Sequence, residues 1–304
     1  MIKSIFLHNL LYWYQVSKRD LPFRNTQDPY KIWLSEIILQ QTRVTQGLPY
    51  YNKFITLFPA VENLANAEEM EVMNAWQGLG YYSRARNLHF TAKFVVNELS
   101  GVFPTAYKDL IQLKGIGDYT ASAISSFAAK EVRPALDGNV YRFVSRLYGV
   151  DTPINTPKSI KDFKKILNEL IDEKNPDIFN QAMIEFGALQ CTPKSPDCEN
   201  CVFNDSCYAF FNNAVFDFPV KIKKKKSIDR FLSFYFIKKD NSTFILKRTE
   251  NSIWQNLYEF PNIESKELFD NEELSNELLG EVEIISIGKP IKHILSHQNI
   301  YAKV

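Results

Sequence analysis

The sequence predicts an α+β protein, in which an all-α first domain is followed by a smaller strand-rich domain. Apolar residues recur at intervals of three and four from residue 5 to about residue 215, as helices require. Runs of strand-forming residues appear only later, at 231–237 and 242–247. A lysine-rich stretch after Phe218-Pro219 separates the two patterns. We therefore expect a helical domain over 1–218, a basic linker over 219–228 and a second domain over 229–304.

Glycine and proline residues mark where the helices of the first domain end. Gly78, Gly101, Gly115 and Pro134 are examples. An early helix runs through the apolar segment 32–39. The helices predicted after it span 62–77, 84–98, 105–113, 118–130, 139–149, 158–171 and 177–190.

The composition excludes several classes of protein. The 304 residues are 45% hydrophobic and 23% charged, which is typical of a globular chain and not of a disordered or collagen-like one. No apolar run reaches about 18 residues, so we expect no membrane-spanning helix. The amino-terminal segment lacks a signal-peptide pattern, so we expect a cytoplasmic protein. The net charge of +1 gives no argument for a nucleic-acid partner.

All four cysteines fall within one short segment, as Cys191-x6-Cys198-x2-Cys201-x5-Cys207. Thiols this close together in a cytoplasmic chain indicate a metal site and not a set of disulfides. Structural zinc is commonly held by two CxxC pairs, and only one such pair is present. The wider spacings favour an iron–sulfur cluster, with zinc as the alternative.

The segment Leu113 to Ala121 predicts a helix–hairpin–helix. Gly115 and Gly117 lie between two helical runs, where backbone amides at the start of the second helix can bind a phosphate oxygen. A plain helical hairpin without a ligand is the alternative.

Two acidic residues have surroundings of opposite character. Glu36 lies inside a nearly continuous apolar helix, where desolvation should raise its pKa and make it a proton donor. Asp137 directly precedes a helix, whose amino terminus should keep it ionised. Such a pair suits acid-assisted cleavage of a glycosidic bond. The alternatives are an exposed glutamate and a simple helix cap.

Together these features resemble the MutY family of adenine DNA glycosylases, within the helix–hairpin–helix glycosylase superfamily. The resemblance covers nearly the whole chain. It rests on the two acidic residues, on the four cysteines and on the segments 21–24, 35–42, 76–82, 85–88 and 137–139. It implies a six-helix barrel module and a second helical module that holds a [4Fe-4S] cluster. The implied substrate is adenine mispaired with 8-oxoguanine, or with guanine, in double-stranded DNA.

The resemblance also implies roles for the residues of the active site. Glu36 protonates the adenine ring, Asp137 stabilises the cationic sugar, and Tyr119 and Asn139 assist at the sugar. The adenine must leave the base stack to be reached. The related endonuclease III enzymes carry a lysine nucleophile where this chain has Tyr119. We therefore expect a monofunctional glycosylase, in which any strand cleavage is weak.

Further residues match DNA-contacting positions of the family. Gln41 and Tyr81 match the side chains that wedge into the duplex. Arg24 and Gln181 match adenine-pocket positions, and Glu185 is a further candidate there. A glutamine suits adenine because its amide can pair with a donor and an acceptor together.

The second domain resembles the Nudix-like domain that follows the glycosylase domain in this family. We find no G-x5-E-x7-REUxEE array, so nucleotide hydrolysis with magnesium is not expected. Ser296 and His297 match a loop that reads the oxidised guanine, and Leu295 stands where the family usually has phenylalanine. The family domain usually continues beyond the position of Val304, so we expect this domain to be incomplete. Lys114 stands where the hairpin usually has proline, and we expect it to add a phosphate contact.

Other functions remain open from the sequence. One alternative is an endonuclease III-like glycosylase and lyase acting on oxidised pyrimidines, which Tyr119 and the second domain disfavour. Another is a non-catalytic iron–sulfur DNA-binding protein, which the presence of both Glu36 and Asp137 disfavours. We expect a monomer that associates with the nucleoid.

Overall fold

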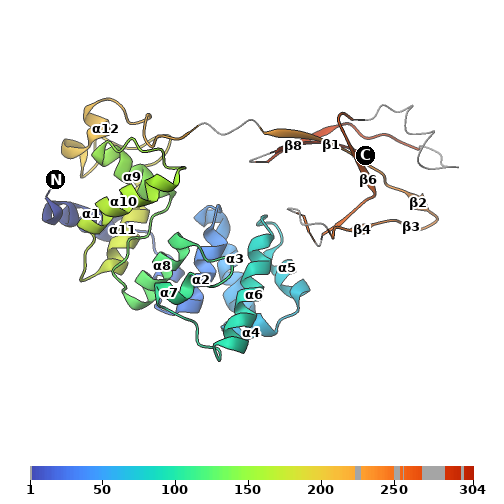
Figure 1. Cartoon of the computed structure of the whole chain (residues 1–304), viewed down its shortest axis with the longest axis horizontal. Helices are drawn as coiled ribbons and strands as arrows, with labels where there is room; N and C mark the ends of the chain where they lie inside the picture. Colours follow the sequence, from blue (N-terminus) through green and yellow to red (C-terminus); the bar gives the residue numbers. More distant parts are fainter. Residues whose placement is uncertain (1, 223–226, 250–253, 256, 269–284, 296–297) are drawn as a thin grey trace. The chain divides into compact units, whose positions relative to one another are not determined.

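The computed structural model describes the chain except residues 1, 223–226, 250–253, 256, 269–284 and 296–297. Contacts divide the chain into two units, Met1–Ile222 and Lys223–Val304. The first unit is helical and the second is built from strands, which confirms the predicted α+β class (Figure 1). Within the described residues, no helix combines the length and the apolar character needed to cross a membrane.

The described residues of the helical unit form fourteen helical elements. They are α1 (Lys3–Ser17), η1 (Pro22–Arg24), α2 (Pro29–Leu39), α3 (Val44–Leu57), α4 (Val61–Asn66), α5 (Glu69–Trp76), α6 (Ser83–Glu98), α7 (Tyr107–Leu110), α8 (Asp118–Ala129), α9 (Gly138–Tyr148), α10 (Pro157–Leu170), α11 (Pro176–Leu189), η2 (Asn204–Ser206) and α12 (Tyr208–Phe211).

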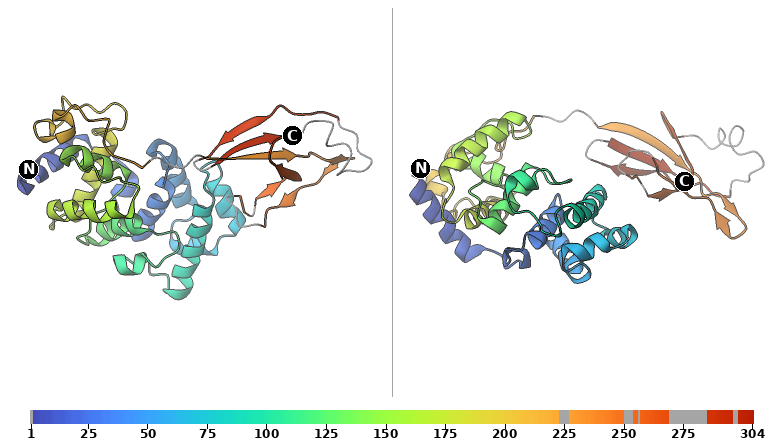
Figure 2. Two further views of the ribbon diagram at one scale, coloured as in Figure 1. Left: turned by 45° about the horizontal axis from the view of Figure 1, so that its top comes forward. Right: turned by 60° about the horizontal axis from the view of Figure 1, so that its bottom comes forward.

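The helical unit has two hydrophobic cores. One is formed by α2 to α8 and contains Trp33, Phe54 and Trp76. The other joins α1 with α9, α10 and α11, and contains Phe6 and Phe186. Helix α2 packs against α8, and α11 contacts both α8 and α9. The contact between α8 and α11 therefore joins the two cores, and Figure 2 shows the helices of this unit from two further sides.

Helix caps fix where the two acidic residues lie. Helix α2 begins at Pro29, and the side chain of Asp28 accepts a hydrogen bond of 3.0 Å from the amide of Tyr30. Helix α9 begins directly after Asp137 and ends at Tyr148; Gly149 is its C-cap, with a φ of 67° that glycine adopts without strain. The sequence predicted this helix over 139–149, one residue from the observed bounds.

The helix predicted over 62–77 is wrong in one respect, because the segment forms two helices, α4 and α5. Ala67 is extended, and the amide of Glu68 donates a hydrogen bond of 3.0 Å to the carboxylate of Glu71 at the start of α5. The break contains neither glycine nor proline, so no local breaker in the sequence marks it.

The second unit contains strands β1 (Ile228–Phe234), β2 (Lys238–Lys239), β3 (Ser242–Thr243), β4 (Leu246–Lys247), β5 (Tyr258–Glu259), β6 (Asn262–Ser265), β7 (Ile291–Ile294) and β8 (Gln298–Lys303). Four of them form a sheet in the order β6-β1-β8-β7. Strand β1 is antiparallel to β6 and parallel to β8, with Phe231 opposite Tyr301. The run predicted over 242–247 is divided between β3, which pairs with β2, and β4, which pairs with β5.

Candidate active site and cluster site

A pocket opens between helices α2, α8, α9 and α11. Its empty volume is about 1260 Å³, part of which is open solvent. It is lined by seven of the predicted site residues, which come from distant parts of the sequence: Arg24, Glu36, Gln41, Tyr119, Asp137, Asn139 and Gln181. The fold therefore brings the proposed acid, the proposed electrostatic group and the proposed adenine contacts to one cavity, as a site for a flipped base requires.

Glu36 lies on the pocket face of α2. Burial raises the pKa of its carboxyl from 4.5 to about 7, and the negative charge of Asp137 adds to this. A hydrogen bond from the Tyr119 hydroxyl and the positive charge of Arg24 act in the opposite direction. With a pKa near neutrality, Glu36 can both hold a proton and release it.

Asp137 is the N-cap of α9 and also faces the pocket. Its Oδ1 accepts hydrogen bonds from the amides of Asn139 at 2.9 Å and Val140 at 2.8 Å, and its Oδ2 accepts one of 2.7 Å from the Asn139 side chain. The helix-terminus argument predicted a stabilised anion. Burial raises the pKa of Asp137 all the same, although these bonds and the charge of Arg142 lower it.

Asn139 is held by a second set of contacts. Nη2 of Arg142 donates to Oδ1 of Asn139 at 2.9 Å and to the carbonyl of Gly187 at 2.5 Å. Nε of the same arginine donates to the carbonyl of Cys191 at 2.7 Å. Arg142 thus connects the start of the cysteine loop with the pair Asp137 and Asn139.

Gly187 allows α11 to lie against the start of α9. A Cβ atom at this position would come within 2.5 Å of the backbone oxygen of Asn139. A side chain here would therefore displace the backbone that orients Asp137.

Tyr119 lies at the start of α8, beside Glu36. Burial raises the pKa of its hydroxyl well above the usual 10, and the negative charges of Glu36 and Asp137 act in the same direction. The group is therefore a neutral phenol that donates to Glu36, and not a nucleophile.

Two arginines line one wall of the pocket, and both pair with a buried glutamate. Glu185 is fully buried, and Arg19 donates to it in bidentate fashion at 2.8 and 2.7 Å. Arg24 donates to Oε2 of Glu185 at 2.5 Å. Burial raises the pKa of Glu185, but the hydrogen bonds and charges of the arginines outweigh it and lower the pKa to about 2.

This arrangement changes the part expected of Glu185. Both arginines line the pocket, whereas Glu185 lies behind them. Nη1 of Arg24 is buried and has no hydrogen-bond partner among the described residues. Glu185 therefore holds Arg24 in place, and one nitrogen of the guanidinium is left without an acceptor among the described residues.

Gln181 lines the pocket from α11. Its Oε1 accepts a hydrogen bond of 2.8 Å from the Tyr14 hydroxyl. This contact orients the amide group, because Oε1 must face Tyr14 and Nε2 then lies on the opposite side.

The residues predicted to contact the duplex lie in loops. Gln41 and Tyr81 both have a positive φ, 56° and 48°, which non-glycine residues adopt only rarely. Gln41 lines the pocket, whereas Tyr81 is 55% exposed and lies outside it.

The predicted hairpin connects α7 with α8. Gly115 has a φ of 83°, and a Cβ atom here would come within 2.9 Å of Asn87. Gly117 is the N-cap of α8. The ammonium group of Lys114 lies 4.5 Å from the ring centre of Phe90. The three hairpin residues are exposed, so a phosphate can reach them.

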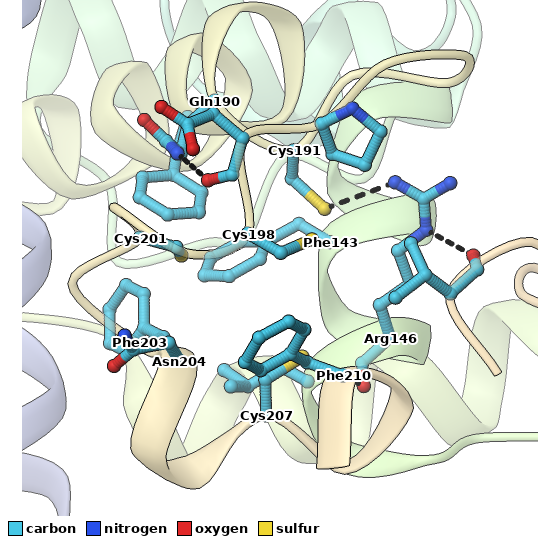
Figure 3. Close-up of a pocket in the computed structure, with 15 residues that line it drawn as sticks. Phe143, Arg146, Gln190, Cys191, Cys198, Cys201, Phe203, Asn204, Cys207 and Phe210 are labelled. Atoms are coloured by element: carbon cyan, nitrogen blue, oxygen red, sulfur yellow. Dashed lines mark hydrogen bonds between the residues drawn. The ribbon is translucent and has the colours of Figure 1, made fainter. Parts of the chain in front are cut away.

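The four cysteines surround a second cavity, shown in Figure 3. All four are free thiols, and Phe143, Phe186 and Phe203 also line the cavity. Among the described residues, no three acidic, cysteine or histidine side chains are arranged to hold a single metal ion. Four sulfur donors around an apolar space fit an iron–sulfur cluster, whose size exceeds that of one ion.

Arg146 of α9 is a site residue that the sequence did not reveal. It is 3% exposed and donates to the carbonyls of Thr192 at 2.7 Å and Val215 at 2.8 Å. Its Nη1 lies 3.5 Å from Sγ of Cys191 (Figure 3). The only hint of Arg146 in the sequence is a charged residue next to the apolar positions of an amphipathic helix. This hint is too weak to identify a site residue.

The proposed guanine-reading residues are only partly described. Ser296 and His297 lie outside the described residues. Leu295 lies between β7 and β8, and its amide donates to the carbonyl of Gln298 at 2.8 Å.

Three parts of the chain match known protein families. Residues 34–169 match the HhH-GPD superfamily of base excision DNA repair proteins, 191–207 match the iron–sulfur binding domain of endonuclease III, and 233–304 match the NUDIX domain. The match to the HhH-GPD superfamily and to the NUDIX domain confirms the predicted fold of both parts of the chain.

Several relatives bear the name adenine DNA glycosylase. One from Buchnera aphidicola of Schizaphis graminum is 39% identical over 264 residues, which are 86% of this chain and 76% of the relative. One from Buchnera aphidicola of Baizongia pistaciae is 35% identical over 99% of this chain and 85% of its own length. A solved thermostable thymine-DNA glycosylase has a TM-score of 0.64 at 26% identity and covers 69% of this chain and 97% of its own. An endonuclease III–DNA complex, 19% identical, shares the fold with a TM-score of 0.60 over 70% of this chain and 98% of its own.

Proposed function

The chain belongs to the adenine DNA glycosylase family of base excision repair enzymes, and from that premise we propose that it removes adenine opposite 8-oxoguanine in double-stranded DNA. The enzyme binds DNA and cleaves an N-glycosidic bond. The observation that carries the proposal is the single pocket in which Glu36, with a pKa of about 7, lies with Asp137 and the adenine-binding candidates.

The proposed reaction is hydrolysis in two stages. Glu36 gives its proton to the adenine ring, so that the base leaves as a neutral molecule and the bonding electrons go with it. The sugar becomes an oxocarbenium-like cation. The Asp137 carboxylate, which Asn139 holds in place, stabilises this cation. Water then adds to the sugar and loses a proton to solvent, which leaves an abasic site.

The adenine pocket is proposed to use Arg24 and Gln181. Arg24 offers a buried donor that has no partner among the described residues, and Gln181 has an amide oriented by Tyr14. Donor and acceptor groups on rigid elements suit a base that presents both. Glu185 and Arg19 keep Arg24 in position.

We propose that the enzyme is monofunctional, because Tyr119 cannot form a Schiff base with the sugar. Treatment with borohydride during the reaction should therefore trap no covalent protein–DNA adduct. A trapped adduct in near-stoichiometric yield would favour the lyase alternative.

The cofactor is a [4Fe-4S] cluster, and the site fits it through four thiols around one apolar cavity. We propose Cys191, Cys198, Cys201 and Cys207 as its ligands. A bound cluster would order the loop, and Arg146 and the phenylalanines would complete its surroundings. The glycosidic bond is cleaved by the residues of the other pocket.

The second domain is proposed to recognise the oxidised guanine through Leu295, Ser296 and His297. A hydrogen bond from Ser296 would distinguish 8-oxoguanine from guanine. The double variant with alanine at 296 and 297 should lose preference for 8-oxoguanine and retain adenine removal opposite guanine. An unchanged ratio of the two rates would contradict this role.

The backbone amides of Gly115 and Gly117, with Lys114, are proposed to bind a phosphate. We further propose that the enzyme acts as a monomer in the cytoplasm, on nucleoid DNA. Light scattering of the purified protein tests whether it is a monomer.

The choice of opposite base tests the proposed substrate. Single-turnover rates should be compared on duplexes with one adenine opposite 8-oxoguanine, guanine or thymine. The proposal expects the highest rate opposite 8-oxoguanine, a lower rate opposite guanine, and no release opposite thymine. Equal rates for all three would contradict it.

A further inference from the structure

Arg84, near the start of α6, contacts two loops that come from different parts of the chain. Its Nη1 donates to the carbonyls of Ile37 and Ile38, both at 3.0 Å, and to that of Gln40 at 2.6 Å. These acceptors lie at the end of α2, where helix carbonyls lack helical partners and attract a cation. The guanidinium thereby fixes the segment that leads into Gln41.

The second loop is held by the other nitrogen of the same group. Nη2 donates to the carbonyls of Leu79 at 3.4 Å and Gly80 at 3.5 Å, directly before Tyr81. The guanidinium lies over the rings of Trp76, at 5.0 Å, and Tyr81, at 5.7 Å. Nε1 of Trp76 donates to the carbonyl of Gly80 at 3.0 Å, which ties this loop to the core as well.

Both loops present one exposed residue in a strained conformation. Gln41 and Tyr81 have a positive φ, which persists only where the surroundings determine the backbone. The first loop has a further contact, because Nε2 of Gln40 donates to Oγ1 of Thr120 at 3.3 Å, next to Tyr119. The position of Gln41 is thus fixed relative to the pocket from two sides.

We propose that Arg84 is a positioning residue that holds Gln41 and Tyr81 as one rigid wedge for base extrusion. The proposal rests on the proposed function, and it takes these two side chains, which match the wedge positions of the family, as the groups that enter the duplex. A wedge must displace stacked bases, and a loop that moves away under this load cannot do so. Loops are mobile unless contacts hold them, so a wedge carried on two loops needs such contacts. A lysine cannot replace the guanidinium, because one ammonium group cannot reach acceptors on both loops in the same geometry.

The test measures base extrusion separately from bond cleavage. The probe is a duplex with 2-aminopurine opposite 8-oxoguanine, whose fluorescence increases when the base leaves the stack. Wild type, Arg84→Gln and Arg84→Lys are each added to saturation, as judged by anisotropy, and the increase is read before any base is released. Arg133→Gln is the matched control, because its guanidinium also contacts an aromatic ring, Tyr107 at 3.7 Å, but neither loop.

We expect Arg84→Gln and Arg84→Lys to give a smaller fluorescence increase than wild type at saturation, and Arg133→Gln to match wild type. Excision of adenine opposite 8-oxoguanine should slow by about 10-fold, or about 1.4 kcal/mol, in Arg84→Gln. Excision of adenine opposite an abasic-site analogue should slow less, because an unpaired base is easier to extrude.

A full fluorescence increase in both Arg84 variants, or an equal loss of rate on the paired and the unpaired adenine, would overturn the proposal. If Arg84→Gln fails to fold, as judged by its melting temperature, Arg84→Lys decides by the same two criteria. A wild-type protein that extrudes the probe but releases no adenine would contradict the proposed function. The fluorescence comparison would still decide the role of Arg84.

Discussion

The side-chain amide of Asn139 donates a hydrogen bond of 2.7 Å to Oδ2 of Asp137, while backbone amides hold Oδ1 of the same carboxylate. Asp137 is therefore both the cap of α9 and a charged group facing the pocket that contains Glu36. The two roles can be separated, because asparagine caps helices about as well as aspartate.

Asp137→Asn should fold normally and lose catalysis. The oxygen of the new side chain can still accept from the backbone amides at the start of α9, but its nitrogen cannot accept from the Asn139 side chain, so the melting temperature should fall only modestly. The excision rate should fall by about 100-fold or more, because a neutral amide cannot stabilise the cationic sugar. Single-turnover kinetics and thermal melting check this together, and an unchanged rate would contradict the electrostatic role.

The rate of adenine removal should fall as pH rises through about 7. The pKa of Glu36 is about 7, so the carboxyl is protonated below this pH and able to act as the acid. Above it the protonated fraction declines about tenfold per pH unit. Single-turnover rates measured from below to above pH 7 test this.

Glu36→Gln is the control for that profile. Its rate should be lower by about 100- to 10,000-fold and should no longer decline through pH 7, because the titrating acid is gone. A decline of the same size in Glu36→Gln would assign the titration to another group.

Glu185→Gln should destabilise the protein, because two arginines would lose their buried partner. The expected loss is roughly 3 kcal/mol, at the lower end for a broken buried ion pair, since Arg19 is one-third exposed. The pKa of Glu185 is lowered from 4.5 to about 2, so this stabilisation is complete above about pH 4.5 and is lost as pH falls towards 2. Urea unfolding of both proteins across this pH range measures it.

Lys31→Gln is a matched control for the ion pair. Lys31 lies 3.7 Å from Asp28, and both side chains are more than one-third exposed. Its loss should change the free energy of unfolding by less than about 1 kcal/mol. If Glu185→Gln lowers the free energy of unfolding by no more than this, the ion pairs of Glu185 with Arg19 and Arg24 do not stabilise the fold.

Gly187→Ala should impair the site from outside the pocket. The new Cβ atom would meet the backbone oxygen of Asn139 at 2.5 Å, so α9 and α11 must separate. We expect lower stability and slower excision together. Gly138→Ala is the control, because a Cβ there meets nothing within 4 Å and its stability should be unchanged or slightly higher. Equal stability of the two variants would contradict the close approach.

The helical domain could be predicted from the sequence because its signals are local. Apolar spacing, glycines and caps act over a few residues, and they placed α8, α9, α10 and α11 within one or two residues of their observed ends. Glu36 and Asp137 could be identified for the same reason. Glu36 is an acidic residue inside an apolar helix, and Asp137 is an acidic residue directly before a helix. The break between α4 and α5 was missed because no local breaker marks it.

The contacts that support the site could not be predicted, because the partners are far apart in the sequence. Glu185 lies 166 positions from Arg19 and 161 from Arg24, and Arg142 lies 49 from Cys191. Nothing in a short segment shows that such side chains meet. The roles of Arg84 and Arg146 likewise appear only when the helices are packed.

The most direct test of the central claim is a single-turnover assay of the wild-type protein on an end-labelled duplex with one adenine opposite 8-oxoguanine, developed with and without alkali. The account predicts strand cleavage at that adenine only after alkali, and loss of this product in Glu36→Gln. Failure to release adenine from a bound duplex would contradict the proposed activity, and cleavage without alkali would contradict the hydrolytic mechanism.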